Sequence, residues 1–380
     1  MTGPLSASTY LRRNLGKTIP LVGVIVLAVL LVAAIISLIN SIPYSIKTIY
    51  SYSKEMLGVG PRGDASMTPK IVERLKTDSP IEISNIMICR AAPSQVRSIV
   101  GKWPFAVLGF ERGDMQAYLD RMKVTSLEGR LPEPGMPEAV VSEPVARNLG
   151  LKLGGVLLGP ELSESYSPKH VKVVGIANTK YWLMLGSVEY MRQYHFPPVD
   201  VAVVFAKDPA QQDQLDRWAN KAFEGDRAQV FAYFLLEKST NEMFVTLYKI
   251  LNVVIGILVL VITLMMGMLI NIYMGQRLIE FGLLQALGYT RKGLLRRVLK
   301  EAFAFVVMGW LFGVLAAYGL LWFAKKQLMD PNAFALNPLD VTAYMYTLAP
   351  PIAVLLVAWV TVYLRFRNFD PVGVVERRLV

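Results

Sequence analysis

Four long stretches without a charged residue constrain this chain more than any other feature of its sequence. Each exceeds the roughly 20 residues that a helix needs to cross the ~30 Å hydrocarbon core of a bilayer. One charged side chain in the middle of such a helix would cost about 2.5–3.5 kcal/mol on insertion. We therefore predict four transmembrane helices, in the runs Thr18–Ile46, Ile250–Gln276, Ala302–Ala324 and Val341–Leu364.

The distribution of basic residues predicts how these helices are oriented. The net charge is +11, and residues 1–17, 275–301 and 365–380 together hold thirteen basic and four acidic residues. The other 27 basic and 25 acidic residues nearly balance. An excess of Lys and Arg on short segments beside membrane helices marks the cytoplasmic side. We therefore expect both termini and residues 275–301 in the cytoplasm. The basic residues then serve orientation and contacts with lipid headgroups, and not binding of nucleic acid.

The first apolar run resembles a signal peptide in its basic start, but its length argues for an anchor. Its apolar part, Ile19 to Ile39, exceeds the roughly 7–15 residues of a signal peptide's apolar region. We expect it to remain as the first membrane helix.

The segment between the first two runs predicts a folded domain outside the cytoplasm. Short apolar periods of both helix and strand type alternate there, as in an α/β or α+β domain, with room for two subdomains. Gly58–Asp64 is expected to be a loop. Ser239 and Glu242 have the spacing of a capping box, which predicts a helix that starts there and runs to Tyr273, with its first ten or so residues standing above the membrane as a stalk. Pro350-Pro351 predicts a kink in the fourth membrane helix.

The fold class is therefore a polytopic α-helical membrane protein with four transmembrane helices and a large mixed α/β extracytoplasmic domain between the first and second. The expected boundaries are a cytoplasmic lead (1–17), the first transmembrane helix (18–41), the extracytoplasmic core domain (42–238), the stalk with the second helix (239–274), a cytoplasmic coupling segment (275–300), the third helix (301–324), a short extracytoplasmic loop (325–341), the fourth helix (342–364) and a cytoplasmic tail (365–380).

The sequence lacks the motifs of catalysis. It contains no GxxxxGK[ST] phosphate-binding loop, no HExxH, no GxSxG and no CxxC, and its one cysteine, Cys89, allows no intrachain disulfide. We expect no catalytic residue, cofactor or metal in this chain. The apolar runs also lack the ionisable side chains that proton-coupled and ion-coupled transporters require, which disfavours a secondary transporter.

Two smaller patterns predict contact surfaces. Leu283, Leu284 and Leu287 place an apolar patch on a very short helix that Gly288 ends. Such a patch suits either a helix lying in the lipid headgroup layer or a knob offered to a groove on a cytoplasmic partner. In the third run, Gly309, Gly313 and Ala317 form a face of small residues that lets a second helix approach closely, either within one subunit or across a dimer.

Two segments carry a recognisable set of residues. In the connector between the second and third apolar runs the set consists of Arg277, Glu280, Gly282, Leu287-Gly288, Arg291 and Glu301. In the outer segment it consists of Glu128–Pro132, Gly135, Glu138–Val141, Ala146, Leu149-Gly150-Leu151 and Val173–Ile176. Both segments resemble the FtsX-like permease family, the membrane subunits of mechanotransmitting (type VII) ABC transporters, which include macrolide exporters and lipoprotein-release permeases. Phe281 and Gln285 depart from the family's usual residues.

The resemblance implies a multi-pass permease of a bacterial plasma (inner) membrane, with both termini cytoplasmic, that is not itself an enzyme. ATP hydrolysis on a separate cytoplasmic ABC ATPase would move the outer domain of this chain to export or extract a hydrophobic, peptide or lipoprotein-like substrate. A second permease chain, in a homo- or heterodimer, membrane lipid and a periplasmic or extracellular protein are the other expected partners. The residues implied in coupling to the ATPase are Glu280, Gly282, Leu283, Leu284, Leu287, Gly288 and Arg291. The alternatives are a regulator that switches an extracytoplasmic hydrolase, as in cell division, and a membrane sensor or scaffold that needs no ATPase.

Overall fold

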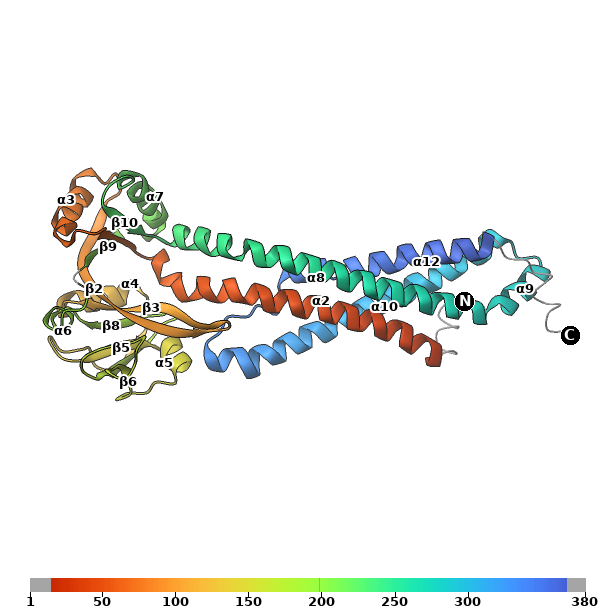
Figure 1. The fold of residues 1–380 in the computed structure, drawn as a ribbon, viewed down its shortest axis with the longest axis horizontal. Helices are drawn as coiled ribbons and strands as arrows, with labels where there is room; N and C mark the ends of the chain where they lie inside the picture. Colours follow the sequence, from red (N-terminus) through yellow and green to blue (C-terminus); the bar gives the residue numbers. More distant parts are fainter. Residues whose placement is uncertain (1–14, 198, 368–380) are drawn as a thin grey trace. The chain divides into compact units, whose positions relative to one another are not determined.

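The computed structural model describes residues 15–197 and 199–367 (Figure 1). Within these residues, four helices are long and apolar enough to cross a membrane, and a mixed α/β domain lies in the sequence between the first and the second. The predicted fold class is confirmed in these terms. Most of the expected lead and tail, residues 1–14 and 368–380, lies outside the described residues.

The chain divides into two compact units. One comprises residues 1–40, 246–325 and 337–380, and the other comprises residues 41–245 and 326–336. The helices of the first unit are, in whole or in part, α2 (Leu15–Ile49), α8 (Tyr233–Gln276), α9 (Leu278–Ala286), α10 (Arg291–Ala324), α11 (Val341–Tyr346) and α12 (Ala349–Arg367).

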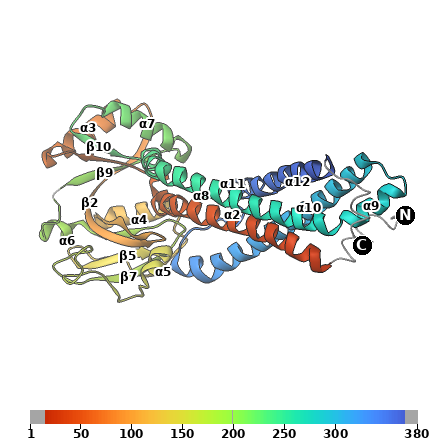
Figure 2. The ribbon, with the colours of Figure 1, turned by 45° about the vertical axis from the view of Figure 1, so that its right-hand side comes forward.

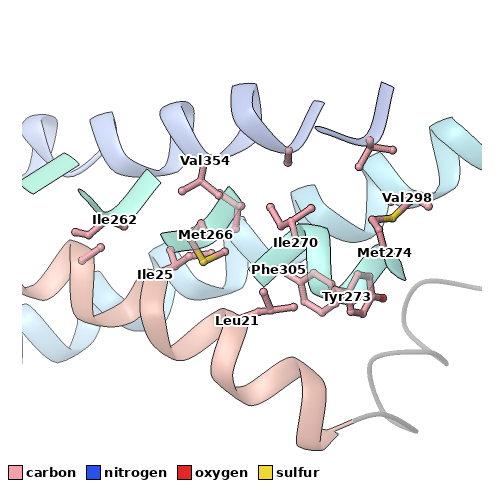
Figure 3. Packing of buried hydrophobic residues seen from close by; sticks show 14 of the residues in the cluster. Leu21, Ile25, Ile262, Met266, Ile270, Tyr273, Met274, Val298, Phe305 and Val354 are labelled. Carbon is pink, nitrogen blue, oxygen red and sulfur yellow. The ribbon is translucent and has the colours of Figure 1, made fainter. Parts of the chain in front are cut away.

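The larger of two buried clusters in the described part of the helical unit draws side chains from all the long helices. Figure 3 shows Leu21 and Ile25 of α2 facing Met266 of α8 and Phe305 of α10. Val354 of α12 joins the same cluster. The opposite faces of these helices expose many large apolar residues, the pattern of helices whose outer surface meets lipid and not water.

The start of α8 differs from the sequence prediction, whereas the kink predicted in the fourth run is present as a break between two helices. The helix α8 begins at Tyr233, six residues before the predicted cap at Ser239. The prediction that Ser239 and Glu242 form a capping box at the start of this helix is therefore wrong. Phe234 and Leu235 pack against a buried cluster of the α/β unit, and this packing extends the helix toward its N-terminus. The fourth run is divided into α11 and α12 at residues 347–348, just before Pro350-Pro351. Proline is accepted in the first turn of a helix but not in its interior, so the helix restarts there.

The α/β unit is built on one sheet, which contains ten strands within the described residues. Nine of them follow the order β10-β1-β9-β2-β3-β8-β5-β7-β4, and β6 pairs with β7. The strands are β1 (Leu57–Pro61), β2 (Ile83–Ser98), β3 (Gly101–Phe110), β4 (Ser126–Gly129), β5 (Glu138–Ser142), β6 (Val156–Leu158), β7 (Val171–Asn178), β8 (Met184–Ser187), β9 (Asp200–Ala206) and β10 (Ala228–Phe231).

Helices cover the two ends of this sheet separately. Figures 1 and 2 show α3 (Thr68–Asp78) and α7 (Gln212–Ala222) at the end of the sheet that holds β9 and β10. Both helices contact β1 and β9, and together they enclose one buried cluster. The helices α4 (Arg112–Arg121), α5 (Glu143–Leu149) and α6 (Val188–Gln193) belong to the other end, around β2, β3, β5 and β8. The mixed α/β architecture predicted for this segment is confirmed.

The predicted loop at Gly58–Asp64 is wrong, because most of it is the buried strand β1. That strand lies between β9 and β10 and pairs antiparallel with both. A Cβ on Gly58 would lie 3.2 Å from the Phe231 side chain, and one on Gly60 would lie 3.1 Å from Val201. Gly58 and Gly60 therefore make room for side chains of the neighbouring strands. In the sequence alone, glycines at this spacing indicate a turn.

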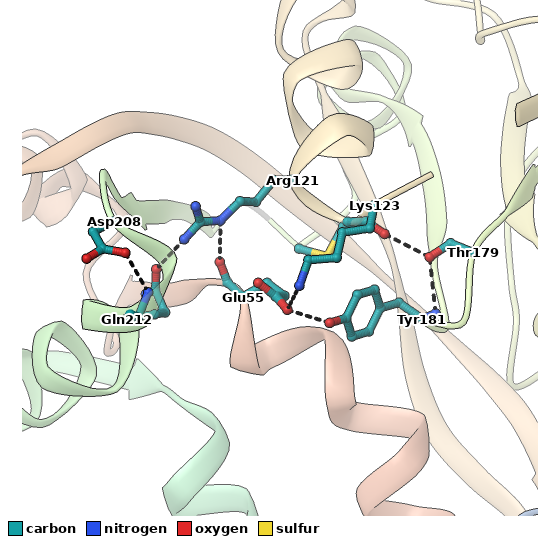
Figure 4. Close-up of polar contacts among 9 residues, drawn as sticks. Glu55, Arg121, Lys123, Thr179, Tyr181, Asp208 and Gln212 are labelled. Carbon is teal, nitrogen blue, oxygen red and sulfur yellow. Dashed lines mark hydrogen bonds and ion pairs between the residues drawn. The ribbon is translucent and has the colours of Figure 1, made fainter. Parts of the chain in front are cut away.

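A polar network joins the segment that follows the first long helix to both ends of the sheet (Figure 4). The Glu55 carboxylate accepts hydrogen bonds from Lys123 Nζ at 2.8 Å and from the Tyr181 hydroxyl. Arg121 donates to the Glu55 carbonyl at 3.2 Å and to Gln212 Oε1 in α7 at 3.3 Å. Burial by itself would raise the pKa of Glu55, but these hydrogen bonds lower it, so the carboxylate stays charged.

Candidate functional site

The connector between α8 and α10 folds as a short helix with a tight exit. A single residue, Arg277, separates α8 from α9, and α9 ends before Gly288, which has the left-handed φ of 94°. Glycine adopts this conformation without the cost that a Cβ adds, and it is typical of the residue that follows a helix. The side chain of Thr290 then accepts a hydrogen bond from Gly293 N and caps α10. The predicted short helix, ended by Gly288, is present.

One face of this helix exposes apolar side chains. Ile279, Leu283 and Leu287 are 38%, 55% and 76% exposed. Residues at a spacing of four lie on the same side of a helix, so these three form one continuous surface. We call these three residues the leucine face. Tyr289 and the basic residues Arg291 and Lys292 are exposed just beyond it.

The opposite face of α9 is anchored to the helical core. Phe281 is buried and its ring centroid lies 5.4 Å from that of Phe366 in α12. Gly282 is buried, and Leu284 is partly buried against the same cluster. Leu284 therefore belongs to the inner side of the helix, and the sequence-based patch of Leu283, Leu284 and Leu287 mixes the two faces. The exposed residue that the sequence argument missed is Ile279, which the helical spacing from Leu283 and Leu287 could have identified.

A buried cluster of charges lies beside α9. Arg277 and Glu301 expose 4% and 1% of their side chains, and their Nη1 and Oε2 atoms are 2.5 Å apart. Arg277 also donates from Nε to Glu280 Oε2 at 2.7 Å and from Nη1 to the Tyr273 hydroxyl at 2.7 Å. Arg297 Nε lies 3.4 Å from the second carboxylate oxygen of Glu301.

Three of the residues that carry the family resemblance in the connector thus meet in this cluster, and one of them, Glu280, is also a predicted coupling residue. Glu280 is half-exposed and is held by Arg277, while Glu301 is buried. Desolvation lowers the pKa of Arg277, but the hydrogen bonds to Glu301 and Glu280 outweigh it and raise the pKa, so the guanidinium is charged at any relevant pH. The sequence holds these residues up to 24 positions apart, and only the fold brings them together.

The face of small residues in α10 is packed against α2 of the same chain. A Cβ added at Gly309 would lie 2.7 Å from Ile25 Cβ, and one added at Gly313 would lie 2.7 Å from Val29 Cβ. Ala317 is fully buried on the same face. Of the two contacts that the sequence left open for this face, the chain makes the one within a single subunit.

The C-terminal third of the chain matches a known family. Residues 252–371 match the family model described as FtsX-like permease C-terminal. This segment is similar to the C-terminal domain of FtsX-like permeases. It contains most of α8 and all of α9 to α12, and therefore both the leucine face and the charge cluster. The predicted resemblance is confirmed over these residues, and the family consists of permease components of ABC-type transporters.

Solved structures of extracellular permease regions resemble the chain more distantly. The periplasmic region of MacB from Actinobacillus actinomycetemcomitans is 8% identical, with 49% of this chain and 92% of that region covered and a TM-score of 0.29. The extracellular domain of the ABC-type transporter YknZ from Gram-positive bacteria is 14% identical, with 46% of this chain and 99% of that domain covered and a TM-score of 0.28. No curated protein matches the chain in sequence.

Proposed function

We propose that this chain is the permease subunit of an ABC transporter and that a separate cytoplasmic ATPase docks on α9. Its ATP-driven motion would be transmitted through the membrane helices to the α/β domain, which would export or extract a hydrophobic, peptide or lipoprotein-like substrate. The observation that carries this proposal is the leucine face, because it is exposed within a segment that belongs to an FtsX-like permease domain.

The build of α9 supports docking to a protein groove. Phe281 on the inner face of α9 packs into the core of the helical unit, so the apolar residues of the leucine face are not needed to hold α9 to that core. A short amphipathic helix that presents residues at i, i+4 and i+8 fits a hydrophobic groove on a partner. Exposed Arg291 and Lys292 next to the face add a positive rim, which would suit an acidic border around the groove.

The remaining assignments follow from the docking site. If α9 meets an ATPase, it lies in the cytoplasm, and the α/β domain lies outside the cytoplasm, in agreement with the excess of basic residues around α9. The chain would then lie in a bacterial inner membrane with both termini cytoplasmic. ATPase subunits of ABC transporters act in pairs, so a second permease chain completes the assembly. ATP hydrolysis would take place on the ATPase and not on this chain.

The test replaces the leucine face with charge. Leu283→Asp and Leu287→Asp place a carboxylate where an apolar contact is expected, and each should lower the affinity of the detergent-solubilised permease for its ATPase at least tenfold. Both residues are exposed, so the thermal unfolding of the permease should stay unchanged. Affinity and permease-stimulated ATP hydrolysis are the two measurements.

Leu287→Met is the matched control, because it keeps an apolar side chain of similar volume and should keep affinity within about twofold. Detergent micelles offer no lipid headgroup layer, so a loss of ATPase binding there reports a protein contact. Unchanged ATPase affinity in both aspartate variants would overturn the proposed docking site, and the leucine face would then be a surface for lipid headgroups.

A further inference from the structure

The side chain of Arg277 connects three helices at the point where α9 leaves the bundle. It donates to Tyr273 of α8, to Glu280 of α9 and to Glu301 of α10, all at 2.5–2.7 Å. The guanidinium also lies 5.0 Å from the centre of the Phe281 ring, in the inner face of α9. The planar guanidinium holds its donors at fixed angles, so these contacts define the orientation of α9 relative to α10.

The short helix α9 depends on such contacts for its orientation. It has nine residues, and isolated helices shorter than about 12–15 residues are marginal in water. On its inner side it is held by Phe281, by the partly buried Leu284 and by the Glu280–Arg277 hydrogen bond. The aromatic contact of Phe281 leads to α12, whereas the charged contact leads to α10.

The helix α10 is well placed to carry a displacement onward. It is continuous from Arg291 to Ala324, and Glu301 lies in its third turn. Farther along, Gly309 and Gly313 let α2 approach so closely that no Cβ fits between the helices. A movement of α10 therefore has a close packing contact through which it can act on α2.

From these contacts we propose that the Arg277–Glu301 ion pair is the rigid link between the docking helix α9 and the membrane helix α10. Arg277 and Glu301 are positioning residues: they do not touch the ATPase but make α9 and α10 move together. This inference rests on the proposed function, because it takes α9 as the docking helix. A buried ion pair contributes little net stability compared with apolar residues of similar size, but it specifies one arrangement of its elements, and that role fits a link between moving helices.

The test removes both charges together. In Arg277→Met/Glu301→Leu the new side chains have sizes similar to the old ones. Both charges of the pair are removed at once, so neither is left buried and unpaired, and the permease should fold. The leucine face is untouched, so the ATPase should bind with an affinity within about twofold of wild type. Permease-stimulated ATP hydrolysis should fall about tenfold or more, because α9 can then move without α10. The assay uses the full-length permease with its ATPase in lipid nanodiscs.

A distance measurement separates a link from a merely structural contact. In a Cys89→Ser background, spin labels at Ala286 of α9 and Leu311 of α10, both exposed, report the separation of the two helices. In the otherwise wild-type protein the distance distribution should stay narrow with and without ATP. In the double variant it should broaden when ATP and the ATPase are present.

Asn271→Leu provides the matched control. It removes the polar contact between α8 and α12, in which Arg365 donates to Asn271 Oδ1 at 2.7 and 2.9 Å, and it should change neither ATP hydrolysis nor the distance distribution. If the double variant does not fold, Arg277→Lys replaces it. That variant keeps the charge but loses the planar fork that reaches three helices, so it should lower the stimulation several-fold while the ATPase stays bound.

Two results would overturn the inference. One is wild-type stimulation together with a narrow distance distribution in the double variant, because the pair would then transmit nothing. The other is loss of ATPase binding in the double variant, because the pair would then shape the docking surface itself. If the ATPase fails to bind even the wild-type permease, the failure belongs to the proposed function and not to the link.

Discussion

The hydrogen-bond partner of a buried acidic residue determines the role of that residue in this molecule. Glu301 has a guanidinium at 2.5 Å and serves as one half of an ion pair. Asp216 in α7 is equally buried, but its hydrogen bond is to the neutral amide of Gln212 at 3.0 Å. Desolvation therefore raises the pKa of Asp216 to about 7, and the hydrogen bond from Gln212 opposes this only in part.

The raised pKa of Asp216 predicts a pH-dependent stability. In the unfolded chain its pKa is about 3.9, so the folded state holds the proton more tightly. This group favours folding fully below about pH 4, and the benefit is lost at about 1.4 kcal/mol per pH unit as the pH rises toward 7. Asp216→Asn removes the charge and keeps an acceptor for Gln212, so it should raise the unfolding temperature at pH 8 and change it little at pH 4.5.

Thermal unfolding of the full-length protein in detergent at the two pH values measures this effect. Asp213→Asn is the control, because it removes an exposed acid of the same helix that pairs with Arg217 at 2.7 Å, and it should not reproduce the gain at pH 8. An equal shift for Asp216→Asn at both pH values would show that its charge does not oppose folding.

At the scale of elements, the contact of α10 with α2 depends on glycine. The two glycines that face Ile25 and Val29 leave no space for a methyl group. Helices in lipid lack a hydrophobic driving force for association, so such close backbone approach and the packing that it allows hold them together.

Substitution of these glycines should therefore separate the two helices. Gly313→Ala places a Cβ 2.7 Å from Val29 Cβ, and overpacking of this kind costs about 1–3 kcal/mol. We expect a lower unfolding temperature in detergent. Gly319→Ala is the matched control on the same helix, because no atom lies within 4 Å of the added Cβ, and it should leave the temperature unchanged or raise it slightly. Equal unfolding temperatures for the two variants would show that the α2–α10 contact tolerates the extra methyl group.

For the whole molecule, the proposed function requires that the α/β domain and α9 lie on opposite sides of the membrane. Basic residues dominate in residues 1–17, 275–301 and 365–380, while acidic and basic residues nearly balance in the rest of the chain. Because Lys and Arg are retained on the cytoplasmic side, this asymmetry predicts one orientation for all four helices.

Cysteine labelling tests the orientation directly. In a Cys89→Ser background, Lys152→Cys lies in the α/β domain and Lys292→Cys lies beside α9, and both positions are exposed. A membrane-impermeant maleimide should label position 152 in intact spheroplasts and position 292 only after permeabilisation. Labelling of position 292 in intact spheroplasts would reverse the topology and remove the docking site from the cytoplasm.

Local pattern was sufficient for the elements whose environment is uniform along their length. The four apolar runs predicted the four long helices because lipid imposes the same demand on every residue of a span. The helix α5 likewise ends where a glycine stands in the sequence, because Gly150 directly after Leu149 adopts the left-handed φ of 71°. The exposed residues Leu283 and Leu287 of the candidate site were likewise predicted from local sequence.

The features that the sequence analysis missed depend on packing against segments distant in the sequence. The strand β1 was missed because its glycines are explained only by Phe231 and Val201 on neighbouring strands. The start of α8 was predicted too late because Phe234 and Leu235 pack against the buried cluster at the sheet. No capping residue near Tyr233 in the sequence indicates this packing. Leu284 was assigned to the wrong face for the same reason.

The sequence by itself therefore determined the membrane class, the order of the parts and the place of the short helix α9, because charge and apolar length act through local chemistry. Only the tertiary structure decided which side of α9 is exposed and that Arg277 and Glu301 form one ion pair. These two residues stand 24 positions apart. Their pairing depends on how three helices pack, and no local pattern encodes that packing.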